Sequence, residues 1–132
     1  MDTPMKKLII ITAFAVMITL VVACGGTPKL TSHNPNTVTL GAASFSITSI
    51  SIKKGSTITF LNDPNTGALH ILVMGQSGQE ESENNAPDFG GAAGHRTEAG
   101  DSWTTPPWST AGTYHVACTV HPVMNLTVIV TS

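Results

Sequence analysis

From residue 37 onward the chain alternates apolar and polar residues in short segments rich in β-branched side chains. Residues 37–40, 45–52 and 56–61 largely show this alternation, and a Lys-Lys-Gly turn at 53–55 separates the last two. Successive side chains of a strand point to opposite faces, so the pattern predicts half-buried strands with one face in a core. The sequence after residue 36 contains no helical period of useful length.

Three more strands are predicted in the second half of the chain. An apolar run at residues 70–74 follows a segment rich in turn-forming residues. Residues 112–117 and 126–130 are two further strand-like segments. Short strands separated by turns over about a hundred residues predict an all-β fold. The expected architecture is a Greek-key β-sandwich that occupies residues 37–132.

Residues 75–100 are the least strand-like part of this predicted domain. The segment is rich in glycine and holds five acidic residues against Arg96 alone. Such a stretch buries little apolar surface, so we expect a long surface excursion. Its acidic residues are predicted to keep the loop soluble, with steering of a basic partner as the alternative. Trp103 and Trp108, which follow, are predicted to pack in the core or at its ends.

The first 23 residues have the pattern of an export signal. Lys6 and Lys7 precede an apolar run at residues 8–22 that only two threonines interrupt. A basic start, an apolar stretch of about 15 residues and small residues at its end predict a secretory signal. The run is shorter than the ~20 residues that a membrane-spanning helix needs. Val-Val-Ala-Cys24 resembles a bacterial lipobox, which implies lipidation of Cys24, with an uncleaved N-terminal anchor as the alternative.

These features place the domain outside the cytoplasm, attached by lipid to the bacterial cell membrane. Residues 24–36 are polar and rich in Gly, Pro, Ser, Thr and Asn, which predicts a flexible tether with His33 as a solvated residue. From Cys24 onward, four Lys/Arg against seven Asp/Glu give a net charge of −3 without a basic patch. This balance argues against nucleic acid as a partner. We expect a monomer.

The seven residues from Cys118 to Met124 carry the candidate chemistry. The thiol of Cys118, the imidazole of His121 and the thioether of Met124 follow directly after the strand-like segment at 112–117. A tight loop after Cys118 would bring all three together. Two soft sulfurs and an imidazole suit copper, and trigonal His₂Cys with a weak axial Met is the blue-copper arrangement. A second histidine must come from elsewhere, and His70, at the start of an apolar run, is the best candidate.

The sequence Cys-Thr-Val-His-Pro-Val-Met resembles the ligand loop of the cupredoxins, the blue type 1 copper proteins. It is most similar to the short loops of amicyanin and pseudoazurin-like members, and a likeness that also includes plastocyanin-like proteins extends over about residues 45–130. The resemblance implies a cupredoxin-like sandwich with one mononuclear type 1 copper ion. Its implied ligands are His70, Cys118, His121 and Met124.

By the same resemblance, the edge of His121 is expected to be partly exposed in an apolar patch that serves as the electron entry and exit. Candidate members of this patch are Pro64, Leu69, Pro122 and Val123, with a role as ordinary loop residues as the alternative. All four ligand positions would be filled, leaving no open position for a substrate. We therefore expect an electron carrier, not an enzyme, with redox proteins as donor and acceptor. No disulfide is predicted, because the metal would occupy Cys118 and lipid would occupy Cys24.

Two positions depart from the family pattern. Ile71 stands where azurin, plastocyanin and amicyanin commonly have an asparagine that ties the ligand loops together, and Ile71 has no side-chain hydrogen bond to offer. The glycine that often follows soon after the methionine is also absent, with Asn125-Leu126 instead. Neither change removes a ligand, but bonds around the ligands tune a metal site, so a family reduction potential does not carry over.

Three other interpretations assign the same residues a different function. A periplasmic copper carrier or scavenger would share the ligands without transferring electrons, although the predicted domain has only two methionines. A zinc site could use His70, Cys118 and His121, but zinc has little use for the thioether of Met124. A lipid-anchored domain without metal would leave these side chains individually replaceable. A binuclear copper centre would need a second cysteine, which the domain lacks.

Overall fold

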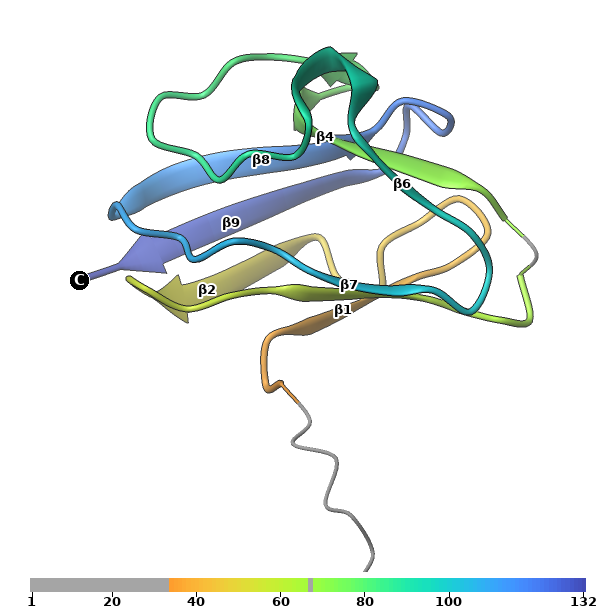
Figure 1. Ribbon diagram of the computed structural model, residues 1–132, viewed down its shortest axis with the longest axis horizontal. Coiled ribbons are helices and arrows are strands. Elements are labelled where there is room, and N and C mark those ends of the chain that lie inside the picture. Colours follow the sequence, from red (N-terminus) through yellow and green to blue (C-terminus); the bar gives the residue numbers. More distant parts are fainter. Residues whose placement is uncertain (1–33, 67) are drawn as a thin grey trace, which may run out of the picture. The chain divides into compact units, whose positions relative to one another are not determined.

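Residues 34–66 and 68–132, which this computed structural model describes, fold into two β-sheets that share one core (Figure 1). The smaller sheet has three strands in the order β1-β3-β7: β1 (Thr37–Leu40), β3 (Thr59–Asn62) and β7 (Ser102–Thr104). Helix in the described residues is limited to one 3₁₀ turn, η1 (Gly91–Ala93). None of the described helices is long and apolar enough to cross a membrane.

The larger sheet has six strands, and its centre carries the candidate chemistry. Its order is β2-β9-β8-β4-β5, and β6 pairs with the first half of β4. The bounds are β2 (Ser49–Lys53), β4 (His70–Gln76), β5 (Gln79–Glu80), β6 (His95–Thr97), β8 (Gly112–Cys118) and β9 (Asn125–Thr131). β1 pairs with β3 and β2 with β9 in parallel, whereas the other pairs are antiparallel. The prediction of an all-β sandwich is confirmed.

The core follows from the alternation that the sequence shows. In β9, Leu126, Val128 and Val130 are buried while the residues between them are exposed or half-buried. Trp108 is fully enclosed and donates its indole N–H to the hydroxyl of Thr105 at 3.1 Å, so its one polar group is satisfied inside the core. Trp103 and Trp108 were predicted to pack in or at the end of the core, and both do so.

The predicted strand at 45–52 is wrong in its first half, because the chain changes sheets there. Phe45 forms an isolated bridge with Leu40 and packs on Phe60, both in the smaller sheet. Only β2, starting at Ser49, joins β9 in the larger sheet. A transfer from one sheet to the other requires a bend, which residues 46–48 provide.

The segment at 75–100 was expected to be a long surface loop, but it is attached to the larger sheet and to the core. β5 and β6 both pair with β4, and Phe89 is buried in the core. The β8 residue His115 also holds the segment, since Glu83 accepts from its backbone N–H at 3.0 Å and contacts its ring Nδ1 at 2.9 Å. The prediction missed these attachments because one buried aromatic residue and two very short strands leave little trace in a polar sequence.

Candidate metal centre

His70, Cys118 and His121 meet at one end of the sandwich. The Nδ1 atom of His70 lies 3.7 Å from the Cys118 Sγ atom, and the Nδ1 atom of His121 lies 3.8 Å from the same sulfur. One donor atom from each residue lies within 4.8 Å of the other two. Both imidazoles therefore turn the same kind of nitrogen toward one thiol, in a place where His70 and Cys118 are fully buried and His121 is half-buried.

Strand pairing explains how residues 48 positions apart come together. Leu72 of β4 stands directly opposite Cys118 of β8. His70 is two residues before Leu72, so it shares the same face of the sheet and lies diagonally across from Cys118. Diagonal partners are within reach of a long side chain. The register of β4 and β8 therefore delivers the first histidine to the thiol.

The loop between β8 and β9 delivers the other two side chains. The Met124 N–H donates to the His121 carbonyl at 2.9 Å, and the Cys118 N–H donates to the Met124 carbonyl at 3.3 Å. Pairing of Ala117 with Asn125 closes the loop directly behind these residues. Met124 is 1% exposed and belongs to the same buried cluster as Cys118.

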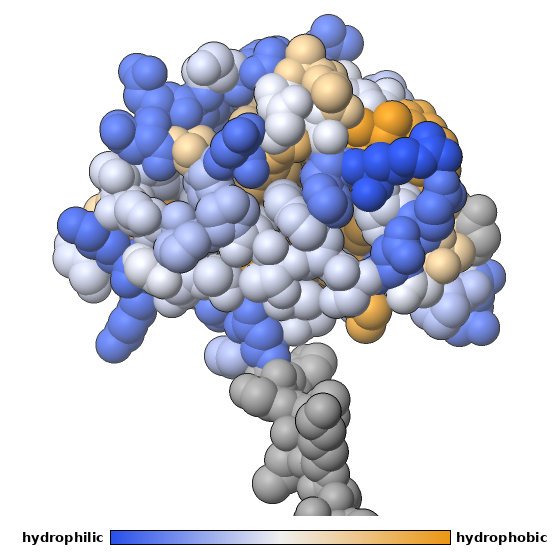
Figure 2. All heavy atoms as spheres, viewed as in Figure 1, coloured by the Kyte–Doolittle hydropathy of each residue, from blue (hydrophilic) through white to orange (hydrophobic). Residues whose placement is uncertain are grey.

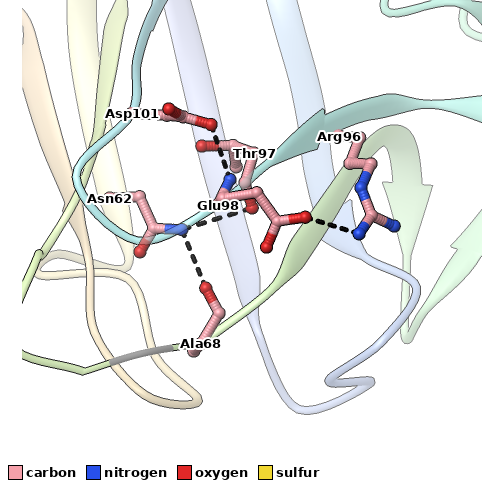
Figure 3. A network of polar contacts seen from close by, with 6 residues as sticks. All are labelled: Asn62, Ala68, Arg96, Thr97, Glu98 and Asp101. Carbon is pink, nitrogen blue, oxygen red and sulfur yellow. Dashed lines mark hydrogen bonds and ion pairs between the residues drawn. The ribbon is translucent and has the colours of Figure 1, made fainter.

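The segment before His70 is held by a buried amide that the sequence did not reveal (Figure 3). The side-chain Nδ2 of Asn62 donates to the Ala68 carbonyl at 3.0 Å and to the Thr97 carbonyl at 3.3 Å. Ala68 is two residues before His70, and Thr97 pairs with His70 across the sheet. Asn62 thus ties the end of β3 to the segment before the histidine and to the strand partner of the histidine. In the sequence it looks like the first residue of a turn.

The surroundings of His70 favour a neutral imidazole. Burial lowers the pKa of His70, a positive charge on His121 lowers it further, and the backbone of Gly41 opposes the shift. Its Nε2 is buried without a partner at hydrogen-bond geometry. A metal binds imidazole only in the neutral form, so burial prepares this residue to be a ligand.

The donor separations fit a trigonal metal site. A metal at about 2.0–2.1 Å from nitrogen and about 2.3 Å from sulfur, with an angle of about 120°, separates the two donors by about 3.8 Å. The two Nδ1-to-Sγ distances of 3.7 and 3.8 Å agree with this value. The two imidazoles and the thiol, together with the buried thioether of Met124 in the same loop, make up the donor set of type 1 copper. The residues therefore fit a single copper ion.

Exposed apolar side chains flank His121 in the loop between β8 and β9. Val123 is 78% exposed and Val120 is 42% exposed, on either side of half-buried His121. Figure 2 shows orange, apolar surface at the upper right, the end of the domain where Figure 1 draws the β8–β9 loop. Of the other expected patch members, Pro64 and Pro122 are exposed and Leu69 is half-buried.

The remaining histidines of the described residues lie outside the cluster. His95 stacks on Trp103 with ring centroids 3.8 Å apart, and His115 contacts Glu83. Burial lowers the pKa of His95, and the carboxylate of Asp101 opposes that shift. The predictions for Cys24 and His33, the signal and most of the tether fall outside the described residues.

Comparisons with known proteins agree with this geometry. The sequence profile of the copper binding proteins of the plastocyanin/azurin family matches residues 32–131. No curated protein matches the chain in sequence.

Solved structures of amicyanin share the fold. An oxidised proline-to-glycine variant of amicyanin has a TM-score of 0.56 at 18% identity, and the match covers 78% of this chain and 88% of that one. Amicyanin from Paracoccus versutus (Thiobacillus versutus) gives 0.53 at 20% identity, with 72% and 79% covered. The Cu(I) form of a methionine-to-alanine variant gives 0.53 at 22% identity, with 74% and 83% covered.

Proposed function

Because the chain belongs to the plastocyanin/azurin family of copper binding proteins, we propose that it carries single electrons between redox proteins through one type 1 copper ion. The proposed ligands are Nδ1 of His70 and His121, Sγ of Cys118 and the thioether of Met124. The observation that carries the proposal is the pair of imidazole nitrogens, each 3.7–3.8 Å from one buried thiol. Bound copper would supply the one-electron couple between Cu(II) and Cu(I).

The protein's contribution is to hold the donors still and to limit access. His70, Cys118 and Met124 are all buried in a packed sandwich, and packed interiors resist deformation. Pro122 fixes one backbone angle next to His121 and removes an N–H. Four donors leave no open position for a substrate, which supports an electron carrier over an oxidase or reductase.

The partner surface in this proposal is the apolar area around His121. Val120 and Val123 are exposed there, and apolar residues at the centre of a contact exclude water from it. Electrons would enter and leave through the half-buried edge of the His121 ring. The exposed acidic side chains of Glu80 and Glu81, in and just after β5, would add attraction for a basic partner.

We also propose that the protein acts outside the cytoplasm as a lipid-anchored monomer. The support is the sequence alone: the basic and apolar start of the chain and the lipobox-like tetrad that ends in Cys24. Mass spectrometry of the membrane fraction tests this part. A diacylglyceryl modification of Cys24 and loss of residues 1–23 are expected, whereas an unmodified, uncleaved N-terminus would contradict it.

One titration tests the copper centre. The purified protein receives one equivalent of Cu(II), and visible and electron paramagnetic resonance spectra are recorded. We expect an intense thiolate-to-copper band with narrow copper hyperfine splitting that Cys118→Ser abolishes and the control His95→Ala retains. A pale, weakly bound species that does not depend on Cys118 would refute the proposal and favour a zinc or Cu(I) carrier.

A second experiment tests the partner surface. Val123→Glu places a charge in the proposed contact without touching a donor, so the visible band should stay unchanged. Electron self-exchange between oxidised and reduced protein, measured by NMR line broadening, should slow by at least tenfold. Ile129→Glu, which charges an exposed apolar side chain of β9, is the matched control and should have little effect. Equal slowing in both variants would contradict the assignment of the surface.

A further inference from the structure

The side chain of Asn125 connects the ligand loop to the turn between β4 and β5. Its Oδ1 accepts a hydrogen bond from the Ser77 N–H at 2.6 Å. Its Nδ2 donates to the carbonyls of Pro122 and Val123 at 3.3 and 3.2 Å. One amide therefore uses both its acceptor and its donor, on two segments 45 or more residues apart in the sequence.

The β4–β5 turn is a rigid support for this connection. Ser77 and Gly78 have φ values of 52° and 75°, and they join the paired residues Gln76 and Gln79. Two consecutive left-handed residues in a two-residue hairpin connection make a tight turn whose twist matches the flanking strands. Because the turn is short and both its ends are in strands, Ser77 presents its N–H from a fixed position.

Gly78 brings this turn into direct contact with the loop. A Cβ atom at position 78 would lie 2.9 Å from the Cβ and 3.0 Å from the Cα of Pro122. The close approach of backbone to proline ring is possible because residue 78 has no side chain. Pro122 follows His121 directly, so any displacement of the proline reaches the histidine through one peptide bond.

The loop has few other attachments on this side. Pro122 and Val123 are exposed, and Ile71, next to His70, offers the loop only its backbone carbonyl, which accepts from the Thr119 N–H at 3.0 Å. That bond holds the start of the loop. After His121, the backbone bonds between Met124 and both His121 and Cys118 hold the end of the loop, while the Asn125 amide and the Gly78 contact hold Pro122 and Val123.

We propose that Asn125, supported by the Ser77–Gly78 turn, is the positioning residue that fixes His121 and Met124 relative to Cys118. This inference rests on the proposed copper function, since it assigns what holds the ligands of that centre. Asn125 itself touches no donor atom. It acts through the backbone of residues 122 and 123, which lie between the two ligands.

Three variants separate the parts of this connection. Asn125→Ala removes all three hydrogen bonds, Asn125→Asp keeps the acceptor for Ser77 but removes both donors, and Gly78→Ala pushes on Pro122. Asn65→Ala is the matched control, because Asn65 is also an exposed turn asparagine but bonds only to Asp63. Far-UV circular dichroism verifies that each variant keeps the fold.

The first readout uses the metal-free protein. Amide hydrogen exchange at Ser77 and Met124, whose N–H groups bond to the Asn125 side chain and to the His121 carbonyl, should speed up at least tenfold in Asn125→Ala, while Val116 and Val128 in the strands exchange as in the wild type. Asn125→Asp should give an intermediate effect. This readout tests the connection even if the wild-type protein forms no blue copper site, so failure of the proposed function is recognised separately.

The second readout uses the copper-loaded protein. In Asn125→Ala and Gly78→Ala we expect a shifted thiolate-to-copper band, a changed electron paramagnetic resonance hyperfine splitting and self-exchange slowed several-fold, with Asn65→Ala unchanged. Faster amide hydrogen exchange in the loop, combined with wild-type spectra and wild-type electron self-exchange, would overturn the positioning role. Asn125 would then stabilise the loop without affecting the copper ligands. Unchanged exchange in Asn125→Ala would overturn the inference altogether.

Discussion

Replacement of Asn62 by alanine tests how strongly one buried amide secures the approach to His70. The change removes two donors, to the carbonyls of Ala68 and Thr97, in a place where Asn62 is fully enclosed. No other side chain among the described residues donates to either carbonyl. The loss should therefore affect both the stability of the fold and the placement of the first histidine.

The size of the effect follows from the two bonds and their burial. Each bond contributes about 1 kcal/mol net, and a carbonyl left buried without a donor costs about 1–3 kcal/mol more. Removing the Asn62 Oδ1, which is itself buried without a partner, offsets part of this cost. We expect the free energy of unfolding to fall by about 2–4 kcal/mol. For a domain of this size that corresponds to a melting temperature lower by on the order of 15 °C.

Differential scanning calorimetry of the metal-free protein measures this change, and a copper dissociation rate measured by chelator competition should rise in the same variant. Thr97→Val is the control. The Thr97 hydroxyl is buried and unpartnered in the described structure, so its removal should leave stability unchanged or raise it by about 1 kcal/mol. If Asn62→Ala melted within about 3 °C of the wild type, the anchoring argument would fail.

Three further predictions test other parts of the structure. The pKa of His95 is lower in the folded protein than its usual 6.5, so the folded state binds fewer protons and stability should fall as the pH drops below that value. His95→Phe keeps the stack on Trp103 and should reduce the slope of the unfolding free energy against pH by up to about 1.4 kcal/mol per pH unit. Urea titrations from pH 5 to 7.5 measure this slope. A steeper dependence of the unfolding free energy on pH in His95→Phe would contradict this prediction. Gly75→Ala should cost more than about 3 kcal/mol, because its Cβ would lie 2.1 Å from the Gln79 carbonyl oxygen, whereas Gly55→Ala, with open space, should cost about 1–2 kcal/mol. Equal costs would argue against the close approach. Copper at a hundredfold excess over its dissociation constant should stabilise the protein by at most about 2.7 kcal/mol, the limit for an unfolded chain that binds no copper, and this effect is reversed by a chelator and absent in Cys118→Ser.

The sequence was most informative about functional residues that lie close together along the chain. Cys118, His121 and Met124 lie within seven residues, so their types and order were enough to predict copper, which the family match supports. His70 was harder, because its place beside the thiol depends on the register of β4 against β8. Its position at the start of an apolar run nevertheless pointed to a strand that could reach the loop.

What the sequence did not reveal depends on distant contacts. Asn62 looked like a turn residue because its two acceptors lie 6 and 35 residues away. Phe45 began a largely alternating segment whose one break, the consecutive polar residues Thr48 and Ser49, lies where β2 begins but does not by itself indicate a change between sheets. Phe89 was one apolar residue in an acidic segment. In each case the local pattern was compatible with several structures, and only tertiary packing selected one.

The placement of the donors along the chain has a consequence for how metal binding and folding are linked. Three of the four proposed donors are close neighbours, and only His70 is distant, 48 residues before Cys118. The unfolded chain therefore keeps a chelating segment, and metal bound there reduces the net stabilisation that copper gives to the native state. His70 is the one donor whose contribution requires β4 to be paired with β8. Most of the difference in copper affinity between the folded and unfolded chain should thus reside in this single histidine, which makes it the link between metal capture and completion of the fold.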